Sequence, residues 1–443
     1  MLKYLIRYRK GLTHIVQLSS LGALVVLIAL STNVAAAERI VAPGENSLAR
    51  AVAVAKPGDV LILGPGLYNG PVVIDKPLTL EGRPTQGAVV DGHDKGTVIR
   101  IIAPDVTIRG LTVRNSGIRQ EDIDSGIFAD KGGDRALIEN NHLDNNEFSI
   151  SLRGAINAEA RHNVVRGRQD LRVNDRGDGI SVWNATGSKA LDNDIRFGRD
   201  GIRSTSSHDN VFTGNRFHDL RYAIHYMWTD GGTITDNLSE GNVVGFALMY
   251  SRQLTIVGNV SRHDQAHGLL LNFVNNARIE GNGVYAGGTE CVFIYNANDN
   301  AIVRNWFEGC PIGVHFTAGS ERNRFSENSF VGNRTQVKYV GTRSLDWASN
   351  GRGNYWSDNA AFDLNGDGIA DMPYRPNDIV DRIVWSVPLA KLLLNSPAVQ
   401  VVRWAQAEFP AITPGGVIDT APLMRPPPFP ALANRTTDTE IPK

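Results

Sequence analysis

Cysteine, excess positive charge and long hydrophobic runs are all scarce in this sequence of 443 residues. Lysine and arginine total 45 against 46 aspartates and glutamates. Because phosphate neutralisation needs a basic face, this balance argues against nucleic acid as a partner. The only cysteines are Cys291 and Cys310. They allow one disulfide, which an oxidising compartment would permit, or a free pair that could bind copper.

The first 37 residues have the pattern of an export signal. A basic segment, MLKYLIRYRKGLTHIVQ, precedes the apolar LSSLGALVVLIALS and the small-residue stretch NVAAA, with cleavage expected after Ala37. The apolar run is shorter than the roughly 20 residues of a transmembrane helix, although an uncleaved anchor is the alternative. Four of the 45 basic residues and no acid lie in this segment, which leaves 41 basic and 46 acidic residues, a net charge of −5. We therefore expect an exported, soluble mature chain.

Internal repetition dominates the rest of the chain. An asparagine recurs in units such as IENNH, FTGNR and IVRNW, at steps of 22, 30, 22, 22, 22, 23, 23 and 23 residues. The one long step contains GRQDLRVNDRGD, an insertion of about eight residues that we expect to form an outward loop. The recurring residues are Asn141, Asn163, Asn193, Asn215, Asn237, Asn259, Asn282, Asn305 and Asn328.

A second pattern of short alternating runs, such as DGISVWN, YAIHYMW and VGFALMY, follows in phase with the asparagines. Such runs between Gly, Asn or Asp are typical of strands between turns. A 22-residue repeat with two or three strands leaves no room for a helix of ten residues, and the regular leucines of leucine-rich repeats are absent. We predict an all-β fold, a right-handed parallel β-helix whose coils lie about 4.8 Å apart. Roughly twelve coils are expected from residue 60 to residue 345.

The ends of the predicted solenoid need covering, because open ends expose unpaired strands and apolar core. A short amphipathic helix at Ser47–Ala55 is expected to cap the N-terminal end, in an entry sequence that resembles pectin-lyase-like β-helix proteins. We predict four segments: a signal peptide at 1–37, the β-helix at 38–345, a C-terminal cap at 346–400, and an extended Pro-rich tail at 401–443.

The alternation predicts which side chains face outward on one strand of each coil. Ile224, Tyr226 and their equivalents form apolar inward columns, so His225 and Met227 should point away from the core, with Met249 beside Met227 on the next coil. Thioether sulfur with imidazole favours a soft ion, above all Cu(I). An adjacent aromatic rim would limit solvent access. It comprises Trp228, Tyr250 and Phe273.

The same outward columns also support a different interpretation. Leu270, Phe293 and Tyr295 extend the patch without offering metal ligands. A contiguous exposed apolar patch marks an interaction site, so the face is a candidate surface for a partner protein. The two interpretations are compatible.

Two further clusters could carry acid–base chemistry. RHDQAHG brings His263, Asp264 and His267 into one expected turn, as an acid/base pair, as secondary copper ligands, or as a solvated turn. Asp178 and Asp200 stack on successive coils, either as paired carboxylates for glycoside hydrolysis or as Asp-Gly turn residues.

DLNGDGIAD has the spacing of the first part of a calcium loop. Asp363, Asn365 and Asp367 alternate, a glycine permits the bend, and Asp371 takes the ninth position. Tyr374 stands where a calcium loop has a bidentate glutamate, so a plain turn is the alternative.

The C-terminal motifs carry a family resemblance. NYWSD (354–358), DLNGDGIADMPY (363–374) and a following Pro388-Leu389, after a β-helix of 22-residue repeats, resemble the NosD family of nitrous oxide reductase maturation. The resemblance implies a non-catalytic periplasmic protein that docks on an ABC transporter, composed of an ATPase and a membrane subunit. It would help supply copper or sulfur for the copper centres of nitrous oxide reductase, with a copper chaperone handing copper over. A carbohydrate-active enzyme (lyase, epimerase or hydrolase) or a structural module on the same fold are the alternatives.

Overall fold

The computed structural model describes residues 37–85, 87–341, 343–377, 379–393, 396–408 and 415–429. The predicted export signal lies outside these residues, apart from Ala37 at its end. In the described part of the chain, no helix is both long enough and apolar enough to cross a membrane.

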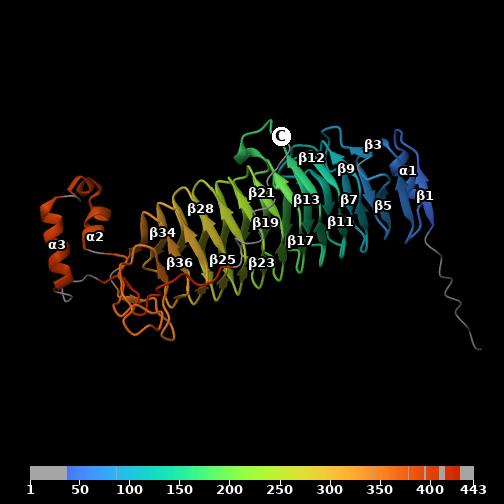
Figure 1. Cartoon of the computed structure of the whole chain (residues 1–443). Helices are drawn as coiled ribbons and strands as arrows, with labels where there is room; N and C mark the ends of the chain where they lie inside the picture. Colours follow the sequence, from blue (N-terminus) through green and yellow to red (C-terminus); the bar gives the residue numbers. More distant parts are fainter. Residues whose placement is uncertain are drawn as a thin grey trace, which may run out of the picture. The chain divides into compact units, whose positions relative to one another are not determined.

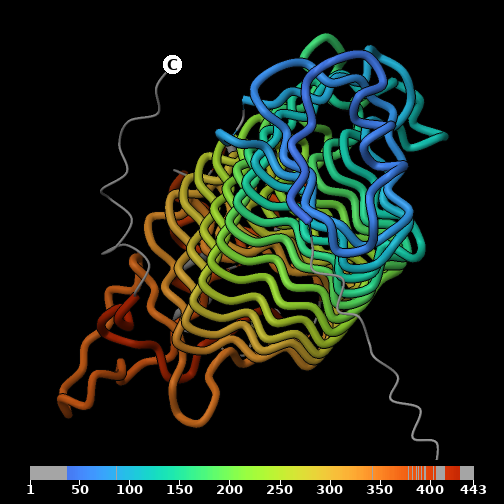
Figure 2. Tube along the Cα trace, turned by 90° about the vertical axis from the view of Figure 1, so that its right-hand side faces the viewer, coloured from blue at the N-terminus to red at the C-terminus, as the bar shows by residue number. Residues whose placement is uncertain are grey.

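Three parallel sheets wind into a right-handed β-helix, as predicted (Figures 1 and 2). They contain thirteen, thirteen and twelve strands, and we call them sheets A, B and C. Each strand pairs with its equivalents on the neighbouring coils, which is the register that the repeat predicts. Sheet A has twelve strands between Val60 and Ser326, in agreement with the expected number of coils.

Sheet A comprises β1 (Glu38–Val41), β2 (Val60–Leu63), β5 (Thr79–Gly82), β8 (Thr107–Arg109), β11 (Leu137–Glu139), β14 (Glu159–Arg161), β17 (Lys189–Leu191), β20 (Val211–Thr213), β23 (Thr233–Thr235), β26 (Thr255–Val257), β29 (Arg278–Glu280), β32 (Ala301–Val303) and β35 (Arg324–Ser326). Sheet B comprises β3 (Gly66–Asn69), β6 (Ala88–Asp91), β9 (Thr112–Arg114), β12 (His142–Asn146), β15 (Val164–Gly167), β18 (Asp194–Arg196), β21 (Arg216–His218), β24 (Leu238–Glu240), β27 (Val260–Arg262), β30 (Gly283–Tyr285), β33 (Trp306–Glu308), β36 (Ser329–Val331) and β39 (Tyr355–Trp356). Sheet C comprises β4 (Val72–Ile74), β7 (Ile99–Ile101), β10 (Ser125–Ala129), β13 (Phe148–Arg153), β16 (Ile180–Trp183), β19 (Asp200–Thr205), β22 (Tyr222–Met227), β25 (Val244–Arg252), β28 (His267–Asn275), β31 (Glu290–Tyr295), β34 (Ile312–Thr317) and β37 (Thr335–Val340).

Apolar columns fill the interior of the coils. On sheet C, the first inward-facing residues of successive strands form a column, and each is at most 3% exposed. Their burial follows from the period-two alternation of a strand. Its members are Ile180, Ile202, Ile224, Phe246, Leu269, Val292 and Val314. Sheet C therefore has one buried face and one outer face, and the outer face carries the candidate sites.

The recurring asparagines form a continuous ladder of hydrogen bonds at one corner. In each step, the Asn backbone N–H and Nδ2 donate to Oδ1 of the next asparagine, as Asn215 does to Asn237 at 3.0 and 2.9 Å. Nδ2 also donates to a backbone carbonyl of the preceding coil, such as Ala190 for Asn215. The buried amides thus find partners within the ladder, which explains why the repeat requires asparagine at this position.

The N-terminal end is capped by α1 (Ser47–Val54), which buries Leu48 and Val52 and agrees with the predicted helix within one residue. The insertion forms a loop with the short 3-10 helix η1 (Val173–Asp175) between β15 and β16. The C-terminal region contains β38 (Leu345–Asp346), α2 (Ile379–Ser386), the 3-10 helix η2 (Pro388–Leu393), α3 (Pro397–Glu408) and β40 (Val417–Ile418).

The expectation of an extended tail from residue 401 needs two corrections. Residues 401–408 belong to α3, which starts with a proline, where the missing N–H is harmless, and continues in helix-forming residues. β40 then pairs with β38, and Leu423 bridges to Tyr355, so the segment after residue 415 is part of the cap.

Candidate functional site

Met227 and Met249 lie directly opposite each other on β22 and β25 of sheet C. Both side chains are half-buried on the outer face, with Thr205 and Asn272 as the register partners on either side. Because paired strands are about 4.8 Å apart, the two flexible thioethers can reach one point above the sheet. The structure thus brings this sequence-predicted pair together.

His225 points away from the core but is only 9% exposed, so its expected exposure needs correction. Its Nδ1 lies 2.9 Å from Oδ2 of Asp200, and the Tyr222 ring meets its edge at 5.0 Å. These two neighbours cover the imidazole, which the alternation of the strand could not reveal. Nδ1 is engaged by the carboxylate, which leaves Nε2 as the coordinating atom of the ring, an arrangement common for metal-binding histidines.

Trp228, Tyr250 and Phe273 form a stacked row. Trp228 directly follows β22, and the other two lie two residues before the ends of β25 and β28. Their ring centroids are 5.6 and 5.0 Å apart, with interplanar angles of 25° and 11°. All three residues have φ near +50°, a left-handed backbone conformation that is uncommon for bulky residues. They are 56%, 42% and 37% exposed. This exposed apolar row beside the methionines matches both the predicted rim and a partner surface.

A charged cluster occupies the next coils of the same face. Glu290 accepts a hydrogen bond from Nδ1 of His315 at 3.1 Å, and its other carboxylate oxygen lies 2.6 Å from Nδ1 of His267. Phe293 lies between the two imidazoles, with ring centroids 5.5 and 5.0 Å away. Burial by itself would raise the pKa of Glu290, but His267 and His315 outweigh it and lower that pKa to about 2. The carboxylate is therefore a fixed anion that holds both rings.

The structure does not unite His263, Asp264 and His267. Asp264 is fully buried and accepts hydrogen bonds from Ser239, Ser261 and the backbone of Asn242. His267 instead faces Glu290, and His263 is exposed at a turn. The predicted cluster does not form because the chain crosses from the interior to the outer face within these few residues.

Asp178 and Asp200 are buried and paired with arginines. Oδ2 of Asp178 lies 2.5 Å from Nε of Arg203, and Asp200 binds Arg221 at 2.8 and 2.7 Å. Burial raises the pKa of Asp178; for Asp200, burial acts in the same direction, but His225 and Arg221 outweigh it and lower the pKa. Both carboxylates are engaged by arginines, and this arrangement does not suit a pair of free catalytic acids. One signal was missed: an arginine follows each aspartate 21 residues later, Arg199 after Asp178 and Arg221 after Asp200.

The loop with Asp363, Asn365, Asp367 and Asp371 is organised by its own hydrogen bonds. Asp363 accepts from the backbone N–H groups of residues 366, 367 and 368, and Asp371 accepts from that of Leu364 at 2.8 Å. Within the residues that the structure describes, no group of three or more His, Cys, Asp or Glu side chains is arranged to hold a metal ion.

Cys291 and Cys310 are joined in a disulfide, with their Cα atoms 5.6 Å apart. The cysteines are therefore not free ligands for copper.

The fold and the outer face define a class: a right-handed β-helix with a surface of methionine, histidine and stacked aromatic residues. The chain belongs to the NosD family. The family model described as "Periplasmic copper-binding protein (NosD)" matches residues 161–361. The "Probable ABC transporter binding protein NosD" of Stutzerimonas stutzeri is 39% identical over 374 residues, covering 81% of this chain and 85% of the relative.

Other comparisons agree at the level of family and fold. The equally named protein of Pseudomonas aeruginosa is 38% identical over 378 residues, covering 82% of this chain and 88% of the relative. Among solved structures, the family 28 exopolygalacturonase of Yersinia enterocolitica aligns with a TM-score of 0.53 and 12% identity, covering 68% of this chain and 77% of the enzyme. That likeness concerns the β-helix alone.

Proposed function

We propose that this chain is a periplasmic accessory protein of an ABC transporter that binds copper and hands it over during assembly of the copper centres of nitrous oxide reductase. The transporter and the copper come from the names of its relatives and of its family. A copper chaperone would be the donor, and the transporter would comprise an ATPase and a membrane subunit. The chain would act by binding rather than catalysis, since its stacked carboxylates, Asp178 and Asp200, form ion pairs with arginines.

The observation that carries the proposal is the register pairing of Met227 with Met249. Two thioethers are soft donors that suit Cu(I), and Nε2 of His225, two residues before Met227 on the same face, could complete a three-donor set. Neutral donors bind a monovalent ion without a fixed charge, which suits a cargo that must leave again. The rings of Trp228 and Tyr250 would shield the ion from water and could add a cation–π contribution.

Replacing both methionines tests the site. In Met227→Leu/Met249→Leu, Cu(I) affinity should fall at least about a hundredfold, because the sulfur donors are lost while side-chain volume is nearly kept. The measurement is titration against a chromophoric Cu(I) chelator, with X-ray absorption reporting copper–sulfur bonds. Met372→Leu is the matched control, since Met372 is an exposed methionine of the cap. Unchanged affinity in the double variant would remove the site assignment.

The cargo has a second candidate, sulfur, because the copper centres need both elements. Metal and sulfide analysis of the protein isolated with its membrane partners would separate the two. Calcium binding by the loop of Asp363, Asn365, Asp367 and Asp371 also stays a proposal, supported by their spacing. Calorimetric titration with calcium would check it.

A further inference from the structure

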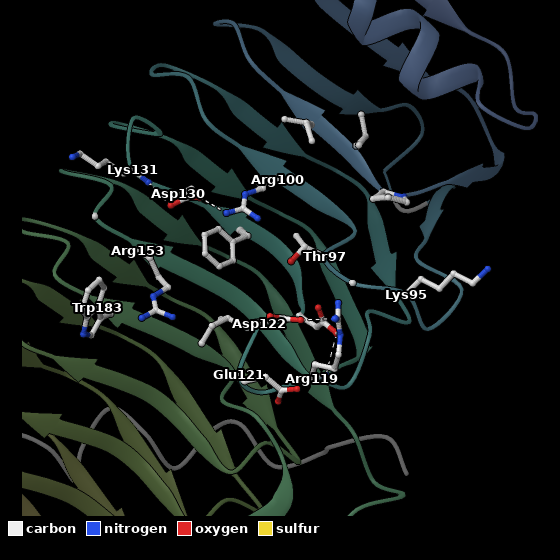
Figure 3. Close-up of a pocket in the computed structure, with 18 of the residues that line it drawn as sticks. Lys95, Thr97, Arg100, Arg119, Glu121, Asp122, Asp130, Lys131, Arg153 and Trp183 are labelled. Carbon is white, nitrogen blue, oxygen red and sulfur yellow. Dashed lines mark hydrogen bonds and ion pairs between the residues drawn. The ribbon is translucent and has the colours of Figure 1, made fainter.

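A hollow lies on the outer face of sheet C, towards its N-terminal strands (Figure 3). Its walls come from β4, β7, β10, β13 and β16 and from the segment 119–124. Five neighbouring strands span about 19 Å, at about 4.8 Å a step. The hollow is thus an elongated groove along the stacking direction of the coils.

Arg153 is the unusual residue of this groove. Its guanidinium lies 4.5 Å from the ring centroid of Trp183, its register partner on the next strand. Arg153 has no hydrogen-bond or ion-pair partner within the part of the chain that the structure describes. Burial, and then the charge of nearby Arg203, lower the pKa of Arg153. The charge of nearby Asp130 acts in the opposite direction but does not outweigh them. A half-buried cation without a bonded carboxylate is costly, and an incoming anion would remove that cost.

The other charges of the groove divide it into two margins. Arg100 pairs with Asp130, and Arg119 pairs with Asp122 and Asp124. Lys131 forms no ion pair among the described residues. Figure 3 shows Lys131, Arg153 and Trp183 along one margin and Arg119, Glu121 and Asp122 along another. The first margin therefore carries two cations without a bonded carboxylate, since the neighbouring Asp130 is paired with Arg100.

We propose that this groove binds an extended acidic segment of a protein partner. Arg153 would receive a carboxylate through its planar N–H edge, which matches carboxylate geometry, and Lys131 would add a second positive charge. At about 3.3 Å for each residue, 19 Å accommodates an extended segment of about six residues. The exposed part of Trp183 would pack against the nonpolar portion of the segment.

The groove favours a peptide over an acidic polysaccharide. A polysaccharide usually meets aromatic platforms for successive sugar rings, but Trp183 has one face occupied by Arg153. The other ring of the groove, Phe128, is 5% exposed and lies under Arg100. The groove offers cations along an extended line and no free aromatic face for sugar stacking. These features suit an acidic peptide.

The groove and the methionines lie on the same outward column of sheet C, but binding in the groove does not require copper. Arg153, Trp183, Thr205, Met227 and Met249 occupy one outward column on successive strands. Trp183 and Met227 are two steps apart, about 10 Å. A partner held by its acidic segment would thus lie beside the proposed copper site, but the peptide should bind with copper absent.

The test is binding of a fluorescent ten-residue peptide of alternating Glu and Ser to the full mature chain, followed by anisotropy without metal. Arg153→Gln should weaken binding at least about tenfold, because it removes a charge-assisted hydrogen bond. Lys131→Gln should weaken it severalfold, and added salt should weaken the wild type. Arg278→Gln, at an exposed arginine of sheet A, is the matched control and should change nothing.

Two results would overturn the proposal. One is no binding of the peptide, or binding that Arg153→Gln leaves unchanged while circular dichroism shows an intact fold. The other is a uronate oligosaccharide of equal charge that binds more tightly than the peptide and loses affinity in Arg153→Gln. Loss of Cu(I) binding in the methionine variant has no bearing on either result, so the two proposals can fail separately.

Discussion

At the scale of single residues, burial in the solenoid interior is favourable for hydrogen-bonded amides but unfavourable for an ionised carboxylate. Asp264 stacks next to Asn242 in an inner column and is fully buried. Burial raises its pKa to about 6, although hydrogen bonds from Ser261, Ser239 and the Asn242 backbone act in the opposite direction. Its ionised form is therefore less favourable in the fold than in the unfolded chain.

The substitution Asp264→Asn should stabilise the protein at pH 7.5 by on the order of 2 kcal/mol, because no buried charge remains. The folded state binds this proton more tightly, so the wild type gains stability as the pH falls through 6 towards 4, and the variant lacks that gain. Thermal unfolding at pH 5 and 7.5 measures the difference. Asp144→Asn, at an exposed aspartate, should show neither effect. Equal pH dependence in wild type and Asp264→Asn would contradict the assignment.

At the scale of elements, Asn328 donates to Oδ1 of Asn354, which extends the asparagine ladder by one step. A residue from far along the chain closes this last step. Oδ2 of Asp419 accepts from the backbone N–H of Asn354 at 2.7 Å and from Nε1 of Trp356 at 2.8 Å. The Trp356 ring stacks on Phe330 at 4.3 Å, so this contact joins the cap to the aromatic end of the core. β40, which ends one residue earlier, is thereby held against β38.

Asp419→Ala should lower the free energy of opening the cap by about 2–4 kcal/mol, because several buried donors lose their acceptor at once. The effect should stay local, since coils of a solenoid contact only their neighbours. Hydrogen exchange measures it: amides of β38, β39 and β40 should exchange faster, while those of β14 to β20 should not. Asp419→Asn, which keeps one acceptor oxygen, is the milder control. Uniform acceleration along the whole chain would contradict a local cap.

The repeating elements were predictable from the sequence, whereas many contacts between elements were not. Alternation and the 22-residue step were sufficient for the coils, the inner columns and the pairing of Met227 with Met249, because stacking in register is dictated by the repeat. The cover over His225, the interior position of Asp264 and the return of Asp419 depend on turns and on non-repeating segments. No periodic signal encodes those contacts, so the structure was needed to find them.

At the scale of the whole molecule, one outward column of sheet C carries two different chemistries. Its N-terminal part presents Arg153 and Trp183, and its middle presents Met227 and Met249. Thr205 separates the two pairs, and no residue belongs to both. A long solenoid allows this arrangement because each coil adds one residue to the column without altering the others.

The two sites should therefore be energetically independent in the isolated protein. Sites about 10 Å apart with no shared partner usually add within about 0.5 kcal/mol. In the triple variant Arg153→Gln/Met227→Leu/Met249→Leu, the loss of peptide affinity should equal that of Arg153→Gln, and the loss of Cu(I) affinity should equal that of the methionine variant. Peptide anisotropy with and without one equivalent of Cu(I) measures the same coupling in the wild type. A change of more than about threefold would contradict independence, since it would require a contact between bound peptide and bound ion that the register spacing does not provide.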